Sequence, residues 1–329
     1  MLYDNHGRPL DYLRLSVTDR CNLRCFYCMP AEGINYLPRK ELLTYEEMLR
    51  LVDVLVQMGI KKIRITGGEP FVRRNLIDFM WSLSEIEGLE EINITTNGVL
   101  TGKYIDQMKA MGVNAVNLSI DSLDRERFHH ITRRDELPKV LETFHQLMDN
   151  NIKTKLNAVV MAGKNHEDLI PLAELTRKYP VGVRFIEEMP FNGNGANYEQ
   201  LHWNHRRILE ELRNEYPDLE KVPDGPNSTS YNYKVPGHQG KIGIIAAFTR
   251  TFCGTCNRIR MTAKGMLKTC LYDDGVLDIK KVMRDGATDE KLKEAFLSAF
   301  NTRAKDGYEA ERNRKKSKKV TESMATIGG

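Results

Sequence analysis

The chain has 329 residues, of which 41% are hydrophobic and 29% charged, a balance that predicts a folded globular protein and excludes an intrinsically disordered one. Its length suits one large domain, or one domain with an extension. No apolar run reaches the ~20 residues of a membrane-spanning helix. Residues 1–6 carry neither the basic nor the apolar part of a secretory signal, so we expect a cytoplasmic protein without a membrane partner. The net charge of +4 is too small to favour nucleic acid as a partner, although it is compatible with an anionic small ligand.

The first predicted strand, residues 12–17, leads into a loop with three thiols, Cys21, Cys25 and Cys28, in the spacing C-x3-C-x2-C. So short a loop cannot easily pair three cysteines as disulfides, and cytoplasmic thiols stay reduced. The thiolates can instead converge on a metal centre. A structural zinc site needs four ligands, whereas a four-iron cluster held by three thiolates leaves one iron free for a further ligand. A zinc knuckle completed by one of the eight histidines is the alternative.

With the aromatic Tyr27 directly before its last cysteine, this loop resembles that of the radical S-adenosylmethionine (SAM) enzymes. The resemblance implies that the free iron binds SAM, and that an electron from the cluster splits its sulfonium bond to give a 5′-deoxyadenosyl radical. Gly67-Gly68-Glu69-Pro70, after the second predicted strand, resembles the second motif of these enzymes. Its glycines would permit positive φ and a close approach of a ligand to the backbone. The resemblance also implies that Tyr27, Gly68, Ser119 and Met189 contact SAM.

Between residues 12 and 188 the chain alternates short strands with amphipathic helices. Further strands are expected at residues 62–66, 91–95, 115–120, 153–160 and 183–187. Helices are expected at residues 44–59, where a capping box opens the helix, after Asn75, after Thr101, and at 138–150 and 166–179. This alternation predicts an α/β fold with a parallel sheet and right-handed crossovers. Six βα units favour an incomplete (βα)6 TIM-like barrel over the closed eightfold one.

Within these strands, apolar and polar residues alternate, although buried parallel strands are normally apolar throughout. Ile63 and Ile65 share one face of their strand, and Arg64 and Thr66 share the other. If the apolar faces pack on helices, the polar faces must line a common, water-filled interior that holds a polar ligand. Arg64 and Lys155 would point into it, joined by Arg14, and their convergence predicts a phosphate-rich substrate. The alternatives are an antiparallel sheet with one solvated face, and separate surface ion pairs for these basic residues.

The C-terminal part of the chain carries the second group of cysteines. After a helix expected at residues 204–215, residues 217–233 read as a linker or lid, and we divide the chain into a partial barrel (1–216) and an α+β extension (217–329). A strand is expected at residues 241–248. Cys253 and Cys256 follow with C-x2-C spacing, and Cys270 comes after a turn. A zinc ribbon lacking one ligand and a second iron–sulfur site both fit this pattern.

The order of these motifs, with Cys256-Asn257-Arg258-Ile259-Arg260 and the segment before Cys28, resembles the GTP 3′,8-cyclase family, which begins molybdenum cofactor biosynthesis. The resemblance implies two [4Fe-4S] clusters, SAM, and GTP as the substrate, from which hydrogen is removed at C3′ before C3′ closes onto C8. It implies catalytic roles for Arg14, Arg258, Arg260 and a Gly328-Gly329 tail that reaches into the cavity. The substrate-binding residues that it implies are Arg14, Arg64, Thr95, Lys155, Arg258 and Arg260.

The implied partners are a flavodoxin- or ferredoxin-like electron donor and a downstream enzyme that takes the molybdopterin precursor, and a homodimer is compatible with the resemblance. The nearest competing interpretation is a radical SAM enzyme with an auxiliary cluster that modifies peptides, for which the interior basic residues would serve no purpose. A zinc protein that binds nucleic acid is a further alternative, disfavoured by the modest net charge. The basic run at residues 312–319 is expected to be a solvated end.

Overall fold

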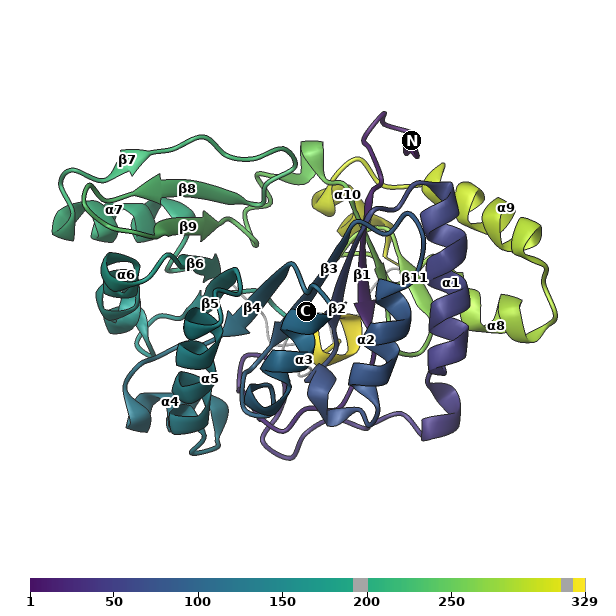
Figure 1. The fold of residues 1–329 in the computed structure, drawn as a ribbon. Helices are drawn as coiled ribbons and strands as arrows, with labels where there is room; N and C mark the ends of the chain where they lie inside the picture. Colours follow the sequence, from purple (N-terminus) through teal and green to yellow (C-terminus); the bar gives the residue numbers. More distant parts are fainter. Residues whose placement is uncertain (192–200, 315–321, 329) are drawn as a thin grey trace.

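The computed structural model describes residues 1–191, 201–314 and 322–328. Its centre is a 12-stranded sheet in the order β12-β11-β10-β1-β2-β3-β4-β5-β6-β9-β8-β7 (Figure 1). Six parallel strands lie side by side in chain order: β1 (Tyr12–Ser16), β2 (Lys62–Thr66), β3 (Glu91–Thr96), β4 (Ala115–Ser119), β5 (Thr154–Val160) and β6 (Gly182–Glu187). Each predicted strand of this part of the chain is therefore present, within one residue of its expected ends.

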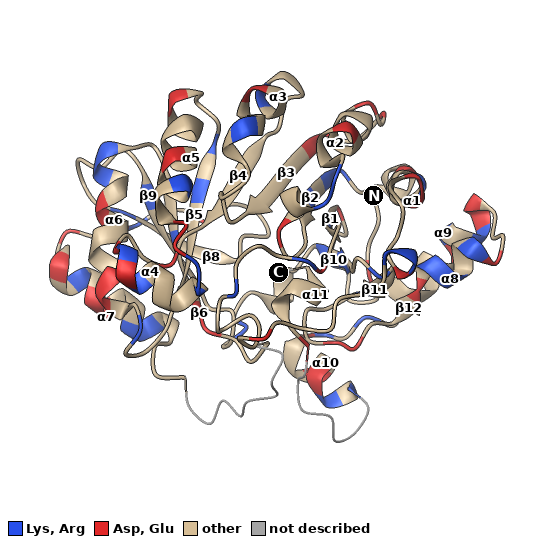
Figure 2. Cartoon of the chain, turned by 90° about the horizontal axis from the view of Figure 1, so that it is seen from below, with Lys and Arg blue, Asp and Glu red and all other residues tan. Residues whose placement is uncertain are grey.

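Helices connect the parallel strands and cover their outer face. They are α1 (Tyr45–Met58), α2 (Leu76–Ser84), α3 (Ile105–Ala110), α4 (Arg125–Thr132), α5 (Leu137–Asp149) and α6 (Leu169–Lys178). Seen from below, they form an arc around the strands, and α11 (Met324–Ile327) lies inside that arc (Figure 2). The sequence predicted all of them except α4, whose segment is mostly polar and buries little besides Phe128 and Ile131.

Local sequence signals account for the bounds of α1. The Thr44 side chain accepts a hydrogen bond from the Glu47 N–H while the Glu47 carboxylate accepts one from the Thr44 N–H, which completes the predicted capping box. Gly59 ends the helix with a φ of 121°. Ile63 and Ile65 of β2 are fully buried in the same apolar core as α1. The alternation of side chains along the strand therefore turns Arg64 to the opposite, inner face.

The parallel run is longer than six strands but does not close into a barrel. β10 (Arg258–Met261) adds to it beside β1, and β9 (Lys241–Ile245) beside β6. Antiparallel strands flank both: β11 (Met266–Lys268) and β12 (Leu277–Asp278) at one end, β8 (Ser230–Lys234) and β7 (Glu220–Lys221) at the other. The predicted open barrel is confirmed, and a wholly antiparallel sheet is wrong for the central strands. The outermost parallel strands, β10 and β9, pair along their outer edges with antiparallel strands, so they cannot pair with each other and close the barrel.

The C-terminal segment also supplies helices: α7 (His205–Glu215), α8 (Ile279–Arg284), α9 (Asp289–Phe300), α10 (Gly307–Asn313) and α11 (Met324–Ile327). Residues 217–233 contain β7 and the start of β8, so most of the expected linker is an edge hairpin with its connecting loop. The expected boundary between residues 216 and 217 stays a prediction. Among the described residues, every helix is too short or too polar to cross a membrane.

Candidate active site

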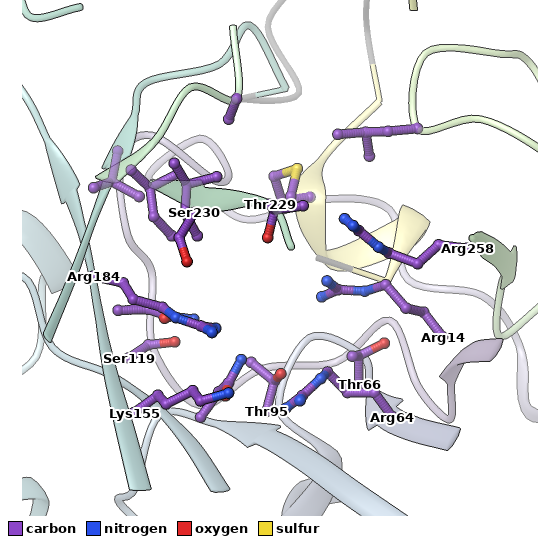
Figure 3. A pocket seen from close by; sticks show the side chains of 18 of the residues that line it. Arg14, Arg64, Thr66, Thr95, Ser119, Lys155, Arg184, Thr229, Ser230 and Arg258 are labelled. Atoms are coloured by element: carbon purple, nitrogen blue, oxygen red, sulfur yellow. The ribbon is translucent and has the colours of Figure 1, made fainter. Parts of the chain in front are cut away.

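The inner face of the half-barrel encloses a cavity of ≈ 760 Å³, within the ~300–1,000 Å³ typical of ligand sites. All six cysteines of the chain line it, together with side chains from β1 to β6 and from β9 and β10. Arg14 and Arg258 point into it from one side, and Lys155 and Arg184 face them from the other (Figure 3). The two groups of cysteines therefore share one chamber, although 225 positions of the sequence separate their closest members, Cys28 and Cys253.

 β1 and β10 are parallel neighbours in the sheet, so the loop after β1 that carries Cys28 and the turn before β10 that carries Cys253 lie toward opposite ends of these strands, with the chamber between them.

The first cysteine loop is fixed by contacts with the segment after β4. The Tyr27 hydroxyl donates to Asp121 Oδ2 at 2.8 Å. The N–H groups of Arg24 and Phe26 donate to the carbonyls of Thr132 and Ile131, at the end of α4. The unpredicted helix α4 therefore supports the loop that carries Cys21, Cys25 and Cys28.

The Gly67-Gly68 pair follows β2 and packs against the residues that directly precede the first cysteine loop. A Cβ atom at Gly67 would lie 2.6 Å from the Thr18 carbonyl oxygen, and one at Gly68 would lie 2.3 Å from that of Arg20. Neither glycine has positive φ, so the expectation of left-handed backbone here is wrong. Close contact with the cysteine loop is what demands glycine, and Gly68 also lines the cavity.

The second cysteine group is held by two buried carboxylates. Glu187, at the end of β6, accepts hydrogen bonds from the N–H groups of Phe248 (3.0 Å) and Thr249 (2.8 Å), shortly before Cys253. Asp273 accepts from the N–H groups of Thr269 (2.8 Å) and Cys270 (2.7 Å). In each case the two donors are backbone N–H groups. These bonds position the turns that carry Cys253 and Cys270.

Five of the six thiols are shifted toward their neutral form. Burial raises the pKa of Cys21 to about 12 and that of Cys270 to about 11, and it also raises the pKa of Cys25, Cys28 and Cys253. Cys256 differs: burial acts to raise its pKa, but the guanidinium groups of Arg258 and Arg303 lower it below the ordinary value. Metal binding at either group must therefore displace protons from most of the thiols.

Three arginines occupy neighbouring positions across the sheet. Arg14 of β1 pairs in register with Arg260 of β10 on one side and with Arg64 of β2 on the other. Further along the sheet, Lys155 of β5 and Arg184 of β6 also point inward (Figure 3). Such a concentration of positive charge on one buried face is favourable only opposite an anion.

The pKa values of several of these basic groups are lowered by burial and by the positive charges of their neighbours. Burial, together with the charges of Arg184 and Arg64, lowers the pKa of Lys155 to about 7. Burial and the charge of Arg64 lower the pKa of Arg184 to about 10, and burial and the charge of Arg260 lower the pKa of Arg14 as well. A bound polyanion would reverse these shifts, because it stabilises the charged forms.

The cavity wall also carries buried polar atoms that find no hydrogen-bond partner in the described part of the chain. They are Thr66 Oγ1, Thr95 Oγ1, Asn117 Oδ1 and Asn157 Oδ1. Buried polar groups are normally satisfied, so these atoms indicate a polar ligand or water in the cavity. Three thiolates in each cysteine group are also the donor set of an iron–sulfur cluster with one free iron. The residues present therefore fit both kinds of group.

The C-terminal tail, residues 322–328, contributes Met324 and Ala325 to the lining of the cavity. Ser323 Oγ donates to the Cys28 carbonyl at 2.7 Å, and Arg260 Nη1 donates to the Gly328 carbonyl at 2.8 Å. Glu322 anchors the tail through the ammonium group of Lys268, a side chain that is 1% exposed. The tail thus lies between the first cysteine loop and β10. Gly329, also predicted as a site residue, lies outside the described residues.

The structure brings together nearly all of the side chains that the sequence singled out. Those that line the one cavity are Arg14, Tyr27, Arg64, Gly68, Thr95, Ser119, Lys155, Met189, Arg258, Arg260 and the six cysteines. Their roles stay predictions. Arg184 was missed, although it alternates with the apolar Val183 and Phe185 and the parity rule applied to β2 would have found it.

The loop between β7 and β8 contributes a wall that the sequence did not predict. Pro223 and residues 225–230 line the cavity, and the Asn227 carbonyl accepts a hydrogen bond from Arg258 Nη2 at 3.0 Å. This loop carried no recognised motif, and only the pairing of β8 with β9 brings it to the site. It therefore forms part of the cavity wall beside Arg258.

Comparison with known proteins agrees with this geometry. Residues 15–176 match the family model described as Radical SAM superfamily, and residues 181–309 match that described as Molybdenum Cofactor Synthesis C. The crystal structure of Streptococcus suis SuiB bound to S-adenosylmethionine has a TM-score of 0.60 and 13% identity, covering 87% of this chain and 68% of that one. At this identity the likeness concerns the fold alone.

Relatives in sequence are more similar. Human molybdenum cofactor biosynthesis protein 1 is 42% identical over 292 residues, which cover 88% of this chain and 46% of that protein. GTP 3′,8-cyclase of Syntrophomonas wolfei is 39% identical over 312 residues, covering 92% of this chain and 93% of that protein. The chain thus spans about half the length of the animal relatives and nearly all of the bacterial one.

The open parallel barrel, the C-x3-C-x2-C loop and the matching family model define a radical SAM protein. Proteins of this class bind SAM beside an iron–sulfur cluster. Within the class, the chain belongs to the GTP 3′,8-cyclase family of molybdenum cofactor biosynthesis proteins.

Proposed function

We propose that the chain converts GTP to (8S)-3′,8-cyclo-7,8-dihydroguanosine 5′-triphosphate, the first step of molybdenum cofactor biosynthesis. The observation that supports this most is the single cavity lined by both cysteine groups and by a cluster of basic side chains. The reaction removes a hydrogen atom from C3′, joins C3′ to C8, and adds one electron and one proton to the purine at N7. An electron donor, of the flavodoxin or ferredoxin kind, has to supply electrons, and a downstream enzyme has to accept the product.

The donor sets suggest where the cofactors bind. Cys21, Cys25 and Cys28 would hold one [4Fe-4S] cluster, and Cys253, Cys256 and Cys270 a second. Tyr27, Gly68, Ser119 and Met189 would contact SAM on the wall near the first cluster. When bound, SAM and the first cluster would supply a 5′-deoxyadenosyl radical able to take hydrogen from the substrate.

The basic residues fall into two parts with different surroundings. The charges of Arg184 and Arg64 act on Lys155, and that of Arg64 acts on Arg184; these three side chains would bind the triphosphate through charge-assisted hydrogen bonds. Arg260 lies close enough to Cys256 and Cys270 for their charges to affect its pKa. It would therefore face the reacting end of the nucleotide, next to Arg14. This division would orient GTP along the cavity, and orientation is the main contribution that a protein makes to radical chemistry.

A first prediction concerns Lys155. Lys155→Gln should weaken the binding of GTP by ~10- to 100-fold, because a charge-assisted hydrogen bond in a partly buried site contributes about 1.5–3 kcal/mol. Lys139→Gln is the matched control, since Lys139 lies on the surface with a side chain that is 60% exposed. Equilibrium binding of GTP, measured anaerobically, checks both variants. Equal affinity for GTP in Lys155→Gln and the parent chain would contradict the proposed phosphate site.

A second prediction is a pH dependence of the same binding step. The Lys155 pKa is near 7 in the free protein, below its ordinary value, and the triphosphate would raise it. Binding of GTP should then take up a proton above about pH 7, and affinity should fall as pH rises from there, by up to ~10-fold per pH unit. Calorimetry in two buffers with different ionisation enthalpies measures this uptake. Lys155→Gln should take up less, and identical uptake by both proteins would assign the proton to another group.

A further inference from the structure

Arg303, which follows α9, is a buried arginine that contacts the second cysteine group directly. Its side chain is 3% exposed. Nη2 donates to Cys256 Sγ at 3.3 Å, Nη1 to the Cys256 carbonyl at 2.9 Å, and Nε to the Thr269 carbonyl at 2.9 Å. Nη2 also donates to the Arg258 carbonyl at 2.9 Å. One guanidinium group thus joins the Cys256 sulfur to the backbone of Cys256 and Arg258 and to the carbonyl just before Cys270.

Asp4 holds this guanidinium in place. Its fully buried carboxylate accepts from Arg303 Nη1 at 3.0 Å and from Arg8 Nε at 2.7 Å. Arg8 in turn donates to the carbonyls of Cys253 (3.2 Å), Ala304 (2.8 Å) and Lys305 (2.6 Å). The N-terminal segment therefore supplies one carboxylate that is shared by two guanidinium groups. Of these two guanidinium groups, that of Arg303 also contacts a cysteine sulfur, whereas the other bonds of Arg8 go to backbone carbonyls.

The first cysteine group is supported differently. Cys21 Sγ accepts from the Leu23 N–H at 3.4 Å and from the Asn97 side-chain amide at 3.7 Å, and both of these donors are neutral. A donor that carries a full positive charge stabilises the more negative, reduced state of an iron–sulfur cluster more than a neutral donor does. The two centres are therefore surrounded by different electrostatic fields.

We propose that Arg303 is a positioning residue that holds the Cys256 and Cys270 segments together and raises the reduction potential of the cluster bound there, with Asp4 orienting its guanidinium group. This inference rests on the proposed second cluster. It assigns to the N-terminal segment, far from the reacting atoms, control of how readily the second centre accepts an electron.

Four variants of the full chain, each loaded with iron and sulfide anaerobically, test the proposal. Arg303→Met removes the charge and the planar set of guanidinium N–H donors at similar volume. Arg303→Lys keeps the charge but loses that planar donor geometry, and Asp4→Asn removes the orienting carboxylate. Arg8→Met is the matched control, because it removes a second guanidinium that Asp4 also holds but whose other bonds go to backbone carbonyls. The readouts are iron per chain, midpoint potentials from redox titrations followed by electron paramagnetic resonance, and the unfolding temperature. A fifth variant, Cys253→Ala, identifies which signal belongs to the second cluster.

Arg303→Met should shift the midpoint of the second cluster to a more negative potential, with the first cluster unchanged as an internal reference. Arg303→Lys and Asp4→Asn should shift it less, in the same direction. Arg8→Met should lower the unfolding temperature without this shift. Selective loss of the second cluster from Arg303→Met, with the shift present in Arg303→Lys, also supports the proposal. A midpoint equal to that of the parent chain in an Arg303→Met protein that keeps its second cluster overturns it, as do equal midpoints in both Arg303→Lys and Asp4→Asn where Arg303→Met has lost that cluster. A parent chain that binds only about four irons would show that the second cluster is absent. This result distinguishes a failure of the proposed second cluster from a failure of the proposed role of Arg303.

Discussion

Cys253→Ala should reduce the cyclisation of GTP by ~10³-fold or more while SAM cleavage continues in part. Cys253 belongs to the cysteine group that would hold the second cluster, whereas the proposed SAM site lies with Cys21, Cys25 and Cys28. Without the second cluster the nucleotide loses its orientation at the reacting end, and misplacement of the reacting atoms is costly. Iron should fall from about eight per chain to about four. Chromatographic quantification of 5′-deoxyadenosine and of the cyclised nucleotide separates the two activities.

Cys21→Ala is the matched control for this experiment. It removes a ligand of the first group, so both SAM cleavage and cyclisation should be lost. Cyclisation at the parent rate in Cys253→Ala would show that the second group has no part in the reaction, and equal loss of both activities in the two variants would show that the cysteine groups do not have separate roles.

Removal of Gly328 and Gly329 should abolish most of the cyclase activity, by ~10²- to 10³-fold, while the iron content stays at that of the parent chain. The Gly328 carbonyl accepts a hydrogen bond from Arg260, which lies in register with Arg14. Without the tail, the Arg260 guanidinium loses the partner that sets its direction, and water gains access to the cavity. Product formation and iron analysis of the truncated protein check this. Full turnover after truncation would exclude a role for the tail.

A single substitution tests the same contact more finely. Gly328 has a φ of 74°, and a Cβ atom there would lie 3.0 Å from Thr66 Oγ1 and 3.3 Å from Ser16 Cβ. Gly328→Ala should therefore reduce turnover through both strain and crowding. Gly286→Ala is the matched control, because Gly286 also has positive φ (86°) but a Cβ there would meet nothing within 4 Å. Gly286→Ala should lower the stability of the protein without affecting turnover. An equal loss of turnover in both variants would assign the loss in Gly328→Ala to backbone strain alone.

Patterns that act over a few residues predicted much of the fold. Alternation along β2 placed Arg64 opposite Ile63 and Ile65, and the same rule placed Lys155 inside the barrel. The capping box of α1 and its terminal Gly59 set the ends of that helix. Cysteine spacing identified both groups of thiols. These features are readable because the side-chain periods of strands and helices, and the geometry of helix caps, are properties of the local backbone.

Contacts between distant segments could not be predicted in this way. The role of α4 in supporting the first cysteine loop depends on packing between segments that lie far apart in the chain. The wall formed by residues 223–230 exists only because β8 pairs with β9. Such pairings depend on which sheet edges are free, and that is decided by the fold as a whole.

The sequence by itself determined the chemistry that the protein carries: two groups of three thiols, strands with one polar face, and the basic residues on those faces. Only the tertiary structure decided how these parts meet. It set Arg14 between Arg64 and Arg260 and brought Asp4 to Arg303 across 299 positions of the chain. The physical reason is that residue type and spacing act locally, whereas strand register and the sharing of a buried carboxylate depend on surfaces that become neighbours only when the chain folds.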